Sequence, residues 1–137
     1  MTDRYRVATL DDIPRGAEPG AGSYEWKPIR HHLGIRAFGV NAGIARQPGD
    51  WVVEDHTELD DNASGHEELY YVARGRARFT IDGNELDAPA GTLVFVADPA
   101  TRRSAKACEA GTTVLYVGAR AGQAFTVSPW ERKYFDA

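Results

Sequence analysis

The residues best suited to chemistry occur together in the sequence His66-Glu67-Glu68-Leu69-Tyr70. In a β-strand, alternate residues point to the same side, which places the Cβ atoms of His66 and Glu68 roughly 6–7 Å apart. At that spacing the two side chains can bind one metal ion. Without a metal, Glu68 or Glu67 can orient the His66 imidazole as a general base, and Tyr70 can donate a proton. His66 and Tyr70 are therefore the candidate catalytic residues.

The strand that carries these residues is predicted over positions 67–74, with a turn at Gly75 and a returning strand over 76–81. A two-residue turn would make the strands a hairpin with these facing pairs: Val72 with Ala77, Tyr70 with Phe79, and Glu68 with Ile81. Glu68 would then be a carboxylate on an otherwise apolar face. A buried carboxylate is costly unless it is paired, so we expect Glu68 to have a partner.

The remainder of the chain predicts more short strands, separated by turns. They are expected over residues 4–10, 29–45, 51–55, 92–96, 102–107 and 112–119, and the apolar run 92–96 suits a core position. Ser128, Pro129 and Glu131 form a capping pattern that predicts a short helix over about 129–135. Many short strands and one helix indicate an all-β sandwich or barrel.

Composition narrows the class of protein. A length of 137 residues predicts one domain, and a net charge of -4 argues against binding to nucleic acid or to an anionic membrane. No apolar run approaches the roughly 20 residues of a membrane-spanning helix. The N-terminus has no apolar signal region, so we expect a cytoplasmic location. The single cysteine, Cys108, excludes an intramolecular disulfide, and we expect its thiol to be buried and inert.

Two short motifs in the middle of the chain resemble those of the cupin superfamily. The first is Glu68, then LYYVAR, then Gly75, and the second is Gly83, then NELDA, then Pro89-Ala90-Gly91. The resemblance implies a small RmlC-like cupin: a double-stranded β-helix, or jelly-roll barrel, with a pocket inside it. It also implies a homodimer.

On this basis we expect one cupin domain over residues 1–137. Its core barrel would span about residues 33–119, its N-terminal arm residues 1–32, and its short C-terminal helix about residues 129–135. The segment 15–22, rich in Gly, Ala and Pro, is expected to be a loop.

Metal ligands that the resemblance implies are matched only at Glu68. The positions of the usual His-x-His fall within residues 61–64, which contain no His, and the later ligand position is Val94. Counting along the first motif puts one ligand position at Asp55, so a slip or bulge would bring His56 to the pocket. His56, His66 and Glu68 would then form a candidate set for Fe, Mn, Zn or Cu.

Three kinds of function follow. The favoured one is a protein that binds a small organic ligand without a metal, because Val94 replaces a ligand His. Its predicted pocket wall is made of Tyr70, Val72, Phe79 and Val94. The second is an enzyme, either metal-dependent and similar to a dioxygenase or isomerase, or metal-free with His66 as base. The third is a dimerising structural module whose pocket is vestigial.

Overall fold

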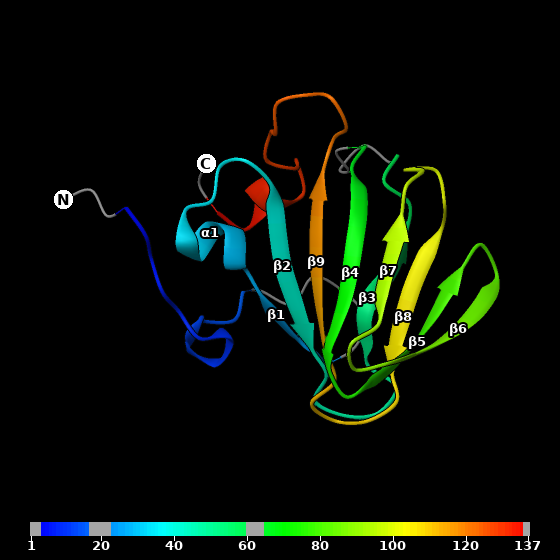
Figure 1. Cartoon of the computed structure of the whole chain (residues 1–137). Helices are drawn as coiled ribbons and strands as arrows, with labels where there is room; N and C mark the ends of the chain where they lie inside the picture. The colour runs from blue at the N-terminus through cyan, green and yellow to red at the C-terminus, as the bar shows by residue number, and fades with distance from the viewer. Residues whose placement is uncertain (1–3, 17–22, 60–64, 136–137) are drawn as a thin grey trace.

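Two antiparallel β-sheets face each other in the computed structural model, which describes residues 4–16, 23–59 and 65–135 (Figure 1). The larger sheet has the strand order β1-β2-β9-β4-β7, with the bounds Glu25–Lys27, Gly39–Ile44, Thr113–Ala119, Glu67–Arg74 and Leu93–Val96. The smaller sheet has the order β3-β8-β5-β6, with the bounds Trp51–His56, Arg103–Ala107, Arg76–Ile81 and Asn84–Pro89. The predicted all-β class is confirmed.

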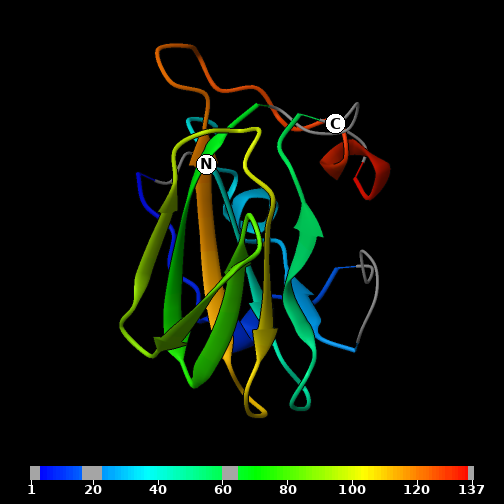
Figure 2. The same ribbon diagram turned by 90° about the vertical axis from the view of Figure 1, so that its right-hand side faces the viewer.

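Consecutive strands mostly alternate between the sheets (Figure 2). From β2 to β9 the chain changes sheet at every connection except the β5–β6 hairpin. The predicted hairpin over residues 67–81 is therefore wrong, because Gly75 turns the chain from the larger sheet into the smaller one. Gly75 has a φ of +74°, and a Cβ there would lie 2.4 Å from Thr112 Oγ1, so the corner favours glycine.

The main hydrophobic core fills the space between the two sheets. It contains Val52, Tyr70, Val72, Phe79, Val96, Ala105 and Val114, with other small apolar residues. The apolar sides of β4 and β5 meet across this core, since the rings of Tyr70 and Phe79 are 5.7 Å apart between centroids. The alternation of apolar residues thus predicted the buried sides correctly, although it assigned the two strands to one sheet.

A short helix replaces the first part of the strand that was predicted over residues 29–45. Helix α1 spans Ile29–Leu33 and ends at Gly34, whose φ of +72° is left-handed. Its apolar residues, Ile29 and Leu33, are four apart and pack on the outer side of β2 with Val40. Within the described ranges, no helix is long and apolar enough to cross a membrane.

The N-terminal segment also differs from the prediction. Residues 5–9 form no strand, and a 3₁₀ turn follows at Leu10–Asp12. The thiol of Cys108 is exposed and not buried as expected, because it follows β8 in a turn between strands.

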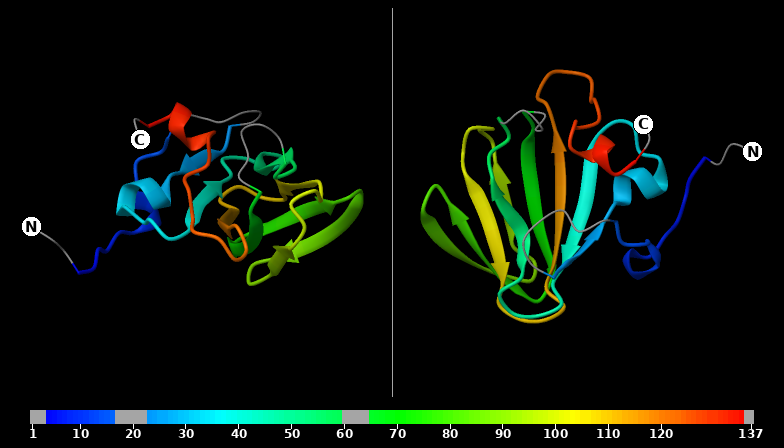
Figure 3. Two further views of the ribbon diagram at one scale, coloured as in Figure 1. Left: turned by 90° about the horizontal axis from the view of Figure 1, so that it is seen from above. Right: turned by 180° about the vertical axis from the view of Figure 1, so that it is seen from behind.

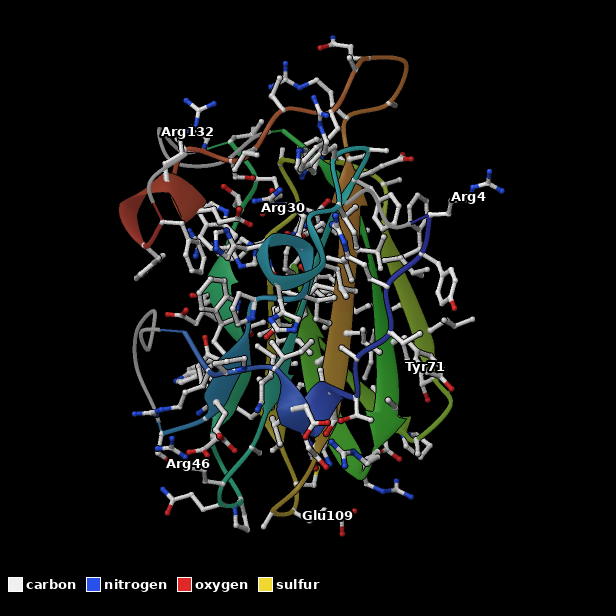
Figure 4. All side chains as sticks on the ribbon, turned by 90° about the vertical axis from the view of Figure 1, so that its left-hand side faces the viewer. Arg4, Arg30, Arg46, Tyr71, Glu109 and Arg132 are labelled. Atoms are coloured by element: carbon white, nitrogen blue, oxygen red, sulfur yellow. The ribbon has the colours of Figure 1, made fainter. Side chains whose placement is uncertain are left out.

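Strand β7 lies at the edge of the larger sheet and not in its interior, as the run 92–96 had suggested. Its outward side chains, Leu93 and Phe95, are 62% and 58% exposed. They pair with Tyr71 and Leu69 of β4, and Tyr71 also points away from the core (Figure 4). An apolar run therefore marked an exposed apolar face here, which sequence periodicity cannot distinguish from a core strand.

The C-terminal segment returns to the upper end of the barrel, next to α1 (Figure 3). Its predicted helix is a single 3₁₀ turn at Glu131–Lys133, and its N-cap is Trp130, not Ser128. Arg30 of α1 forms an ion pair with Glu131, which fastens this segment to the barrel. Around it, Trp26 of β1 contacts Trp130 and Tyr134 at centroid distances of 5.6 and 5.4 Å.

We expect Gly43→Ala to destabilise the fold by about 1–3 kcal/mol, because there is no room for a side chain. A Cβ at Gly43 would lie 2.3 Å from the hydroxyl of Tyr116, which donates a 2.7 Å hydrogen bond to the carbonyl of Val52. Gly39→Ala on the same strand is the matched control, since its Cβ would meet nothing closer than 3.4 Å. Urea unfolding of both variants measures the difference; equal stabilities would contradict the steric argument.

Candidate functional site

A cavity of about 330 Å³ lies at the end of the barrel, among the last residues of β3 and β9 and the first residues of β4. Its wall comes from both sheets and from the C-terminal segment. The polar residues that line it include Asn41, Glu54, His56, Glu58, His66 and Glu68. The aromatic residues include Tyr24, Trp26, Tyr70, Tyr116, Trp130 and Tyr134. The cavity is therefore a mixed polar and aromatic pocket.

Strand register determines which side chains face this cavity. Asn41 of β2, Tyr116 of β9 and Tyr70 of β4 are paired neighbours, so they form one row across the larger sheet. In the next row, Glu68 stands beside Gly118. A Cβ at Gly118 would lie 3.2 Å from Glu68 Cγ and 3.3 Å from His66 Nδ1. The glycine thus leaves room for two functional side chains.

Glu68 has the partner that its position required, and the partner is Arg103 of the opposite sheet. Arg103 is 0% exposed and donates from Nη1 to Glu68 Oε1 at 2.9 Å. Its other nitrogens donate to the carbonyls of Thr101 and Asp98, at 3.0 and 3.2 Å. The hydroxyl of Tyr70 donates to the same carboxylate oxygen. The expectation that Glu68 needs a partner is confirmed.

Arg103 itself was not among the predicted site residues, although the sequence holds a signal for it. It alternates with Ala105 and Ala107, and both alanines are buried in the core. The alternation of β-strand side chains therefore turns Arg103 inward as well.

His56 is positioned by an irregularity of β3, as the sequence argument required. The register of β3 against β8 shifts between Val53 and His56. The imidazole Nε2 lies 2.9 Å from Glu58 and 3.6 Å from Glu68, and Nδ1 donates to the carbonyl of Glu54 at 2.6 Å. Burial alone would lower the pKa of His56, but the hydrogen bonds to Glu58 and Glu68 outweigh it and raise the pKa to about 10. His56 is thus a cation at neutral pH.

His66 lies on the same side of the chain as Glu68 and lines the cavity, as alternation predicts. Burial lowers the pKa of its imidazole, and the charge of Arg120 acts in the same direction. His66 is therefore neutral at pH 7. Its ring is 5.5 Å from that of Phe125. Among the described residues, Glu68 accepts hydrogen bonds from Tyr70 and Arg103 and lies 3.6 Å from His56, and no hydrogen bond joins it to His66.

Tyr70, the candidate proton donor, is almost fully buried. Burial raises its pKa well above the ordinary value, and the charge of Glu68 adds to this shift. Its proton is already donated to Glu68. Tyr70 is therefore a structural link between the core and Glu68.

Metal-ligating atoms converge differently from the predicted set. In the described part of the chain, three such residues have ligand atoms within 4.8 Å of one another: His56, Glu58 and Glu68. Glu58 thus stands where the sequence hypothesis had His66. Glu58 follows His56 by two residues in a polar stretch and was not among the predicted site residues.

The predicted pocket wall is divided between the cavity and the core. Tyr70 lines the cavity. Val72 and Phe79 lie in the main hydrophobic core, and Val94 packs against that core. Asn41 of β2 also lines the cavity. Its position was predicted as strand, without a functional role.

We expect Arg103→Met to destabilise the protein by on the order of 3 kcal/mol, because it leaves the carboxylate of Glu68 without its buried partner. Adding Glu68→Gln to that variant should restore part of the loss. Arg102→Met is the matched control, since Arg102 is an exposed neighbour that forms an ion pair with exposed Asp55. The free energies of unfolding in urea test this, and a loss in Arg102→Met as large as in Arg103→Met would refute it.

The pH dependence of stability should report the ion pairs of His56. Folding raises the pKa of His56 from 6.5 to about 10. The stabilisation by its ion pairs is therefore complete below about pH 6.5 and is lost as pH rises through 10. We therefore expect the stability difference between the wild type and His56→Gln to shrink from about pH 6 to pH 10. His32→Gln, a change at an exposed histidine of α1, serves as control. A constant difference would contradict the assigned charge.

Comparison with known proteins gives structural likeness only. No protein-family model and no curated protein matches the sequence. A cupin protein from Bacteroides fragilis superposes with a TM-score of 0.60 at 18% identity, covering 93% of each chain. A predicted oxalate decarboxylase from Thermotoga maritima superposes with a TM-score of 0.63 at 21% identity, covering 82% of this chain and 97% of that chain.

A third similar structure is a sugar phosphate isomerase from a cupin superfamily, from Silicibacter pomeroyi. It superposes with a TM-score of 0.65 at 20% identity and covers 85% of this chain and 76% of that chain. These likenesses agree with the two facing antiparallel sheets described above. The chain therefore has the cupin fold, the double-stranded β-helix of the jelly-roll type.

Proposed function

We propose that this protein binds a small organic molecule, without a metal, in the cavity at the open end of its barrel. The observation that carries the proposal is the side chain of Asn41. Its Oδ1 is buried and has no hydrogen-bond partner among the described residues, although Asn41 lines the cavity. Leaving a buried acceptor unsatisfied costs about 1–3 kcal/mol. A ligand that donates a hydrogen bond would remove this cost.

The form of the cavity supports an organic ligand. Its volume of about 330 Å³ falls in the range of small-molecule pockets. Aromatic rings make much of its wall, and a few polar groups converge within it, as in most sites that orient a small molecule. Trp26, Trp130 and Tyr134 contribute apolar area, and Asn41 and Glu54 contribute polar atoms.

The carboxylate–histidine cluster, whose ligand atoms converge, already forms hydrogen bonds and ion pairs within the protein, and this supports a pocket without the metal that the cupin fold commonly holds. Oε1 of Glu68 already accepts hydrogen bonds from Tyr70 and Arg103. His56 carries a proton that a metal must displace, because the ligand form of histidine is neutral. The charges of Glu58 and Glu68 are thus balanced by His56 and Arg103, and this arrangement supports a metal-free pocket.

The activities for which similar structures are named do not suit this wall. A sugar phosphate and oxalate are anions, and such ligands are usually held by Arg or Lys side chains. Among the described residues that line the cavity there is neither Arg nor Lys. A metal-free reaction with His66 as base is the second candidate function, and it is favoured by the neutral imidazole that faces the same cavity.

We expect the tag-free protein to show a thermal shift with at least one compound of a broad metabolite panel, since a ligand that binds only the folded state stabilises it. Asn41→Leu keeps the size of the side chain and removes the acceptor, so it should weaken that shift. Asn84→Leu, at the exposed first residue of β6, is the control.

The same protein should not bind Mn²⁺, Fe²⁺, Zn²⁺ or Cu²⁺ at near-stoichiometric occupancy at pH 7, because His56 is protonated and Glu68 is already bonded. Metal analysis after dialysis with each ion measures this. Stoichiometric metal that is lost in Glu58→Gln, together with no ligand from the panel, would replace the proposal with the metal-dependent alternative.

A further inference from the structure

The charges around the cavity are not fully balanced. Five carboxylates line it: Glu54, Asp55, Glu58, Glu68 and Glu131. Four of them have a cationic partner among the described residues, namely Arg102 for Asp55, His56 for Glu58, Arg103 for Glu68 and Arg30 for Glu131. The remaining carboxylate is Glu54.

Glu54 has a neutral partner. The hydroxyl of Tyr24 donates to Glu54 Oε2 at 3.0 Å. Burial raises the pKa of Tyr24, with the charges of Tyr116 and Glu54 acting in the same direction, so the phenol keeps its proton. Burial also raises the pKa of Tyr116, which senses the charge of Glu54 as well. Two protonated phenols therefore surround this carboxylate, and neither offsets its charge.

A second, independent feature of the same cavity lacks a hydrogen-bond donor. Asn41 is 6% exposed, and its Oδ1 is unsatisfied within the described structure. It stands on β2 next to Tyr116, and Tyr116 is near Glu54. A carboxylate and an amide oxygen are both acceptors. A ligand that satisfies both acceptors is a cation that carries N–H or O–H donors.

Aromatic rings of β1 and of the C-terminal segment form another part of the cavity wall. Trp26, Trp130 and Tyr134 have centroids 5.4 to 6.5 Å apart, and their planes are inclined by 51° to 66°. All three line the cavity, and Tyr134 is close enough to Tyr24 to affect its titration. Inclined aromatic faces attract organic cations, most strongly where water is excluded.

We infer that the ligand of this cavity is a small organic cation, an amine or quaternary ammonium compound with a polar donor, whose charge is met by Glu54 and whose donor is met by Asn41. This inference rests on the proposed small-molecule function and specifies its ligand class. Trp26, Trp130 and Tyr134 enclose the apolar part of the cation.

Calorimetric titration with matched probes tests the charge directly. Choline and 3,3-dimethylbutan-1-ol have the same shape and the same hydroxyl but differ in charge, and benzylamine, benzyl alcohol and benzoate form a second matched set. We expect the cationic member of at least one set to bind about tenfold or more tightly than its neutral partner, because the site offers one unneutralised carboxylate. Benzoate should not bind.

Glu54→Gln keeps the shape of the side chain and removes its charge. In that variant we expect the preference for the cation to fall to within about twofold, while the affinity of the neutral partner is unchanged. Glu109→Gln, at the opposite end of the barrel, is the control (Figure 4). The comparison of probes on the wild type holds even if Glu54→Gln fails to fold.

The outcomes separate this inference from the proposed function. Equal or tighter binding of a neutral or anionic probe overturns the cation assignment and leaves the small-molecule function standing. A cation preference that survives in a folded Glu54→Gln protein overturns the role of Glu54. If neither these probes nor the metabolite panel produce binding, both the inference and the proposed function fail.

Discussion

The buried ion pair between Arg103 and Glu68 is the interaction on which the rest of the site depends. It joins the two sheets across the interior, because Arg103 belongs to β8 and Glu68 to β4. A charge in a barrel core is costly unless its hydrogen bonds are satisfied. Here the guanidinium also donates to two main-chain carbonyls, and Tyr70 shares the carboxylate. The polar end of the cavity is thereby held in one arrangement.

This pair also limits the chemistry of the cavity. Glu68 occupies the position that the cupin resemblance gives to a metal ligand, yet its oxygen already serves Arg103 and Tyr70. His56 is then held as a cation between Glu58 and Glu68. Positively charged protein groups therefore lie beside both carboxylates, as the proposed metal-free pocket requires. Among the described residues, Oδ1 of Asn41 is left without a hydrogen-bond partner, and this supports the proposed organic ligand.

Sequence patterns predicted the framework better than the pairing of its parts. The turn glycines, the alternation in residues 67–74 and the spacing of the short strands all depend on local geometry, and they were sufficient to identify a cupin-like barrel. The pairing of strands depends on contacts between distant segments, so the corner at Gly75 was mistaken for a hairpin. The helix Ile29–Leu33 was missed because its two apolar residues are four apart, a spacing that fits either a helix or a strand.

What the sequence by itself determined is which residues of 67–74 and 76–81 face inward, because side-chain direction follows from the backbone period of each strand. It therefore identified Glu68 as an inward carboxylate in need of a partner. Only the tertiary structure decided that the partner is Arg103, from a strand 35 positions away. It likewise brought His56 and Glu58 to Glu68 and left Oδ1 of Asn41 without a partner among the described residues, since both depend on how the sheets close on each other. Contacts between side chains of distant strands form the site, and the periodicity of one strand does not predict which distant residue it will meet.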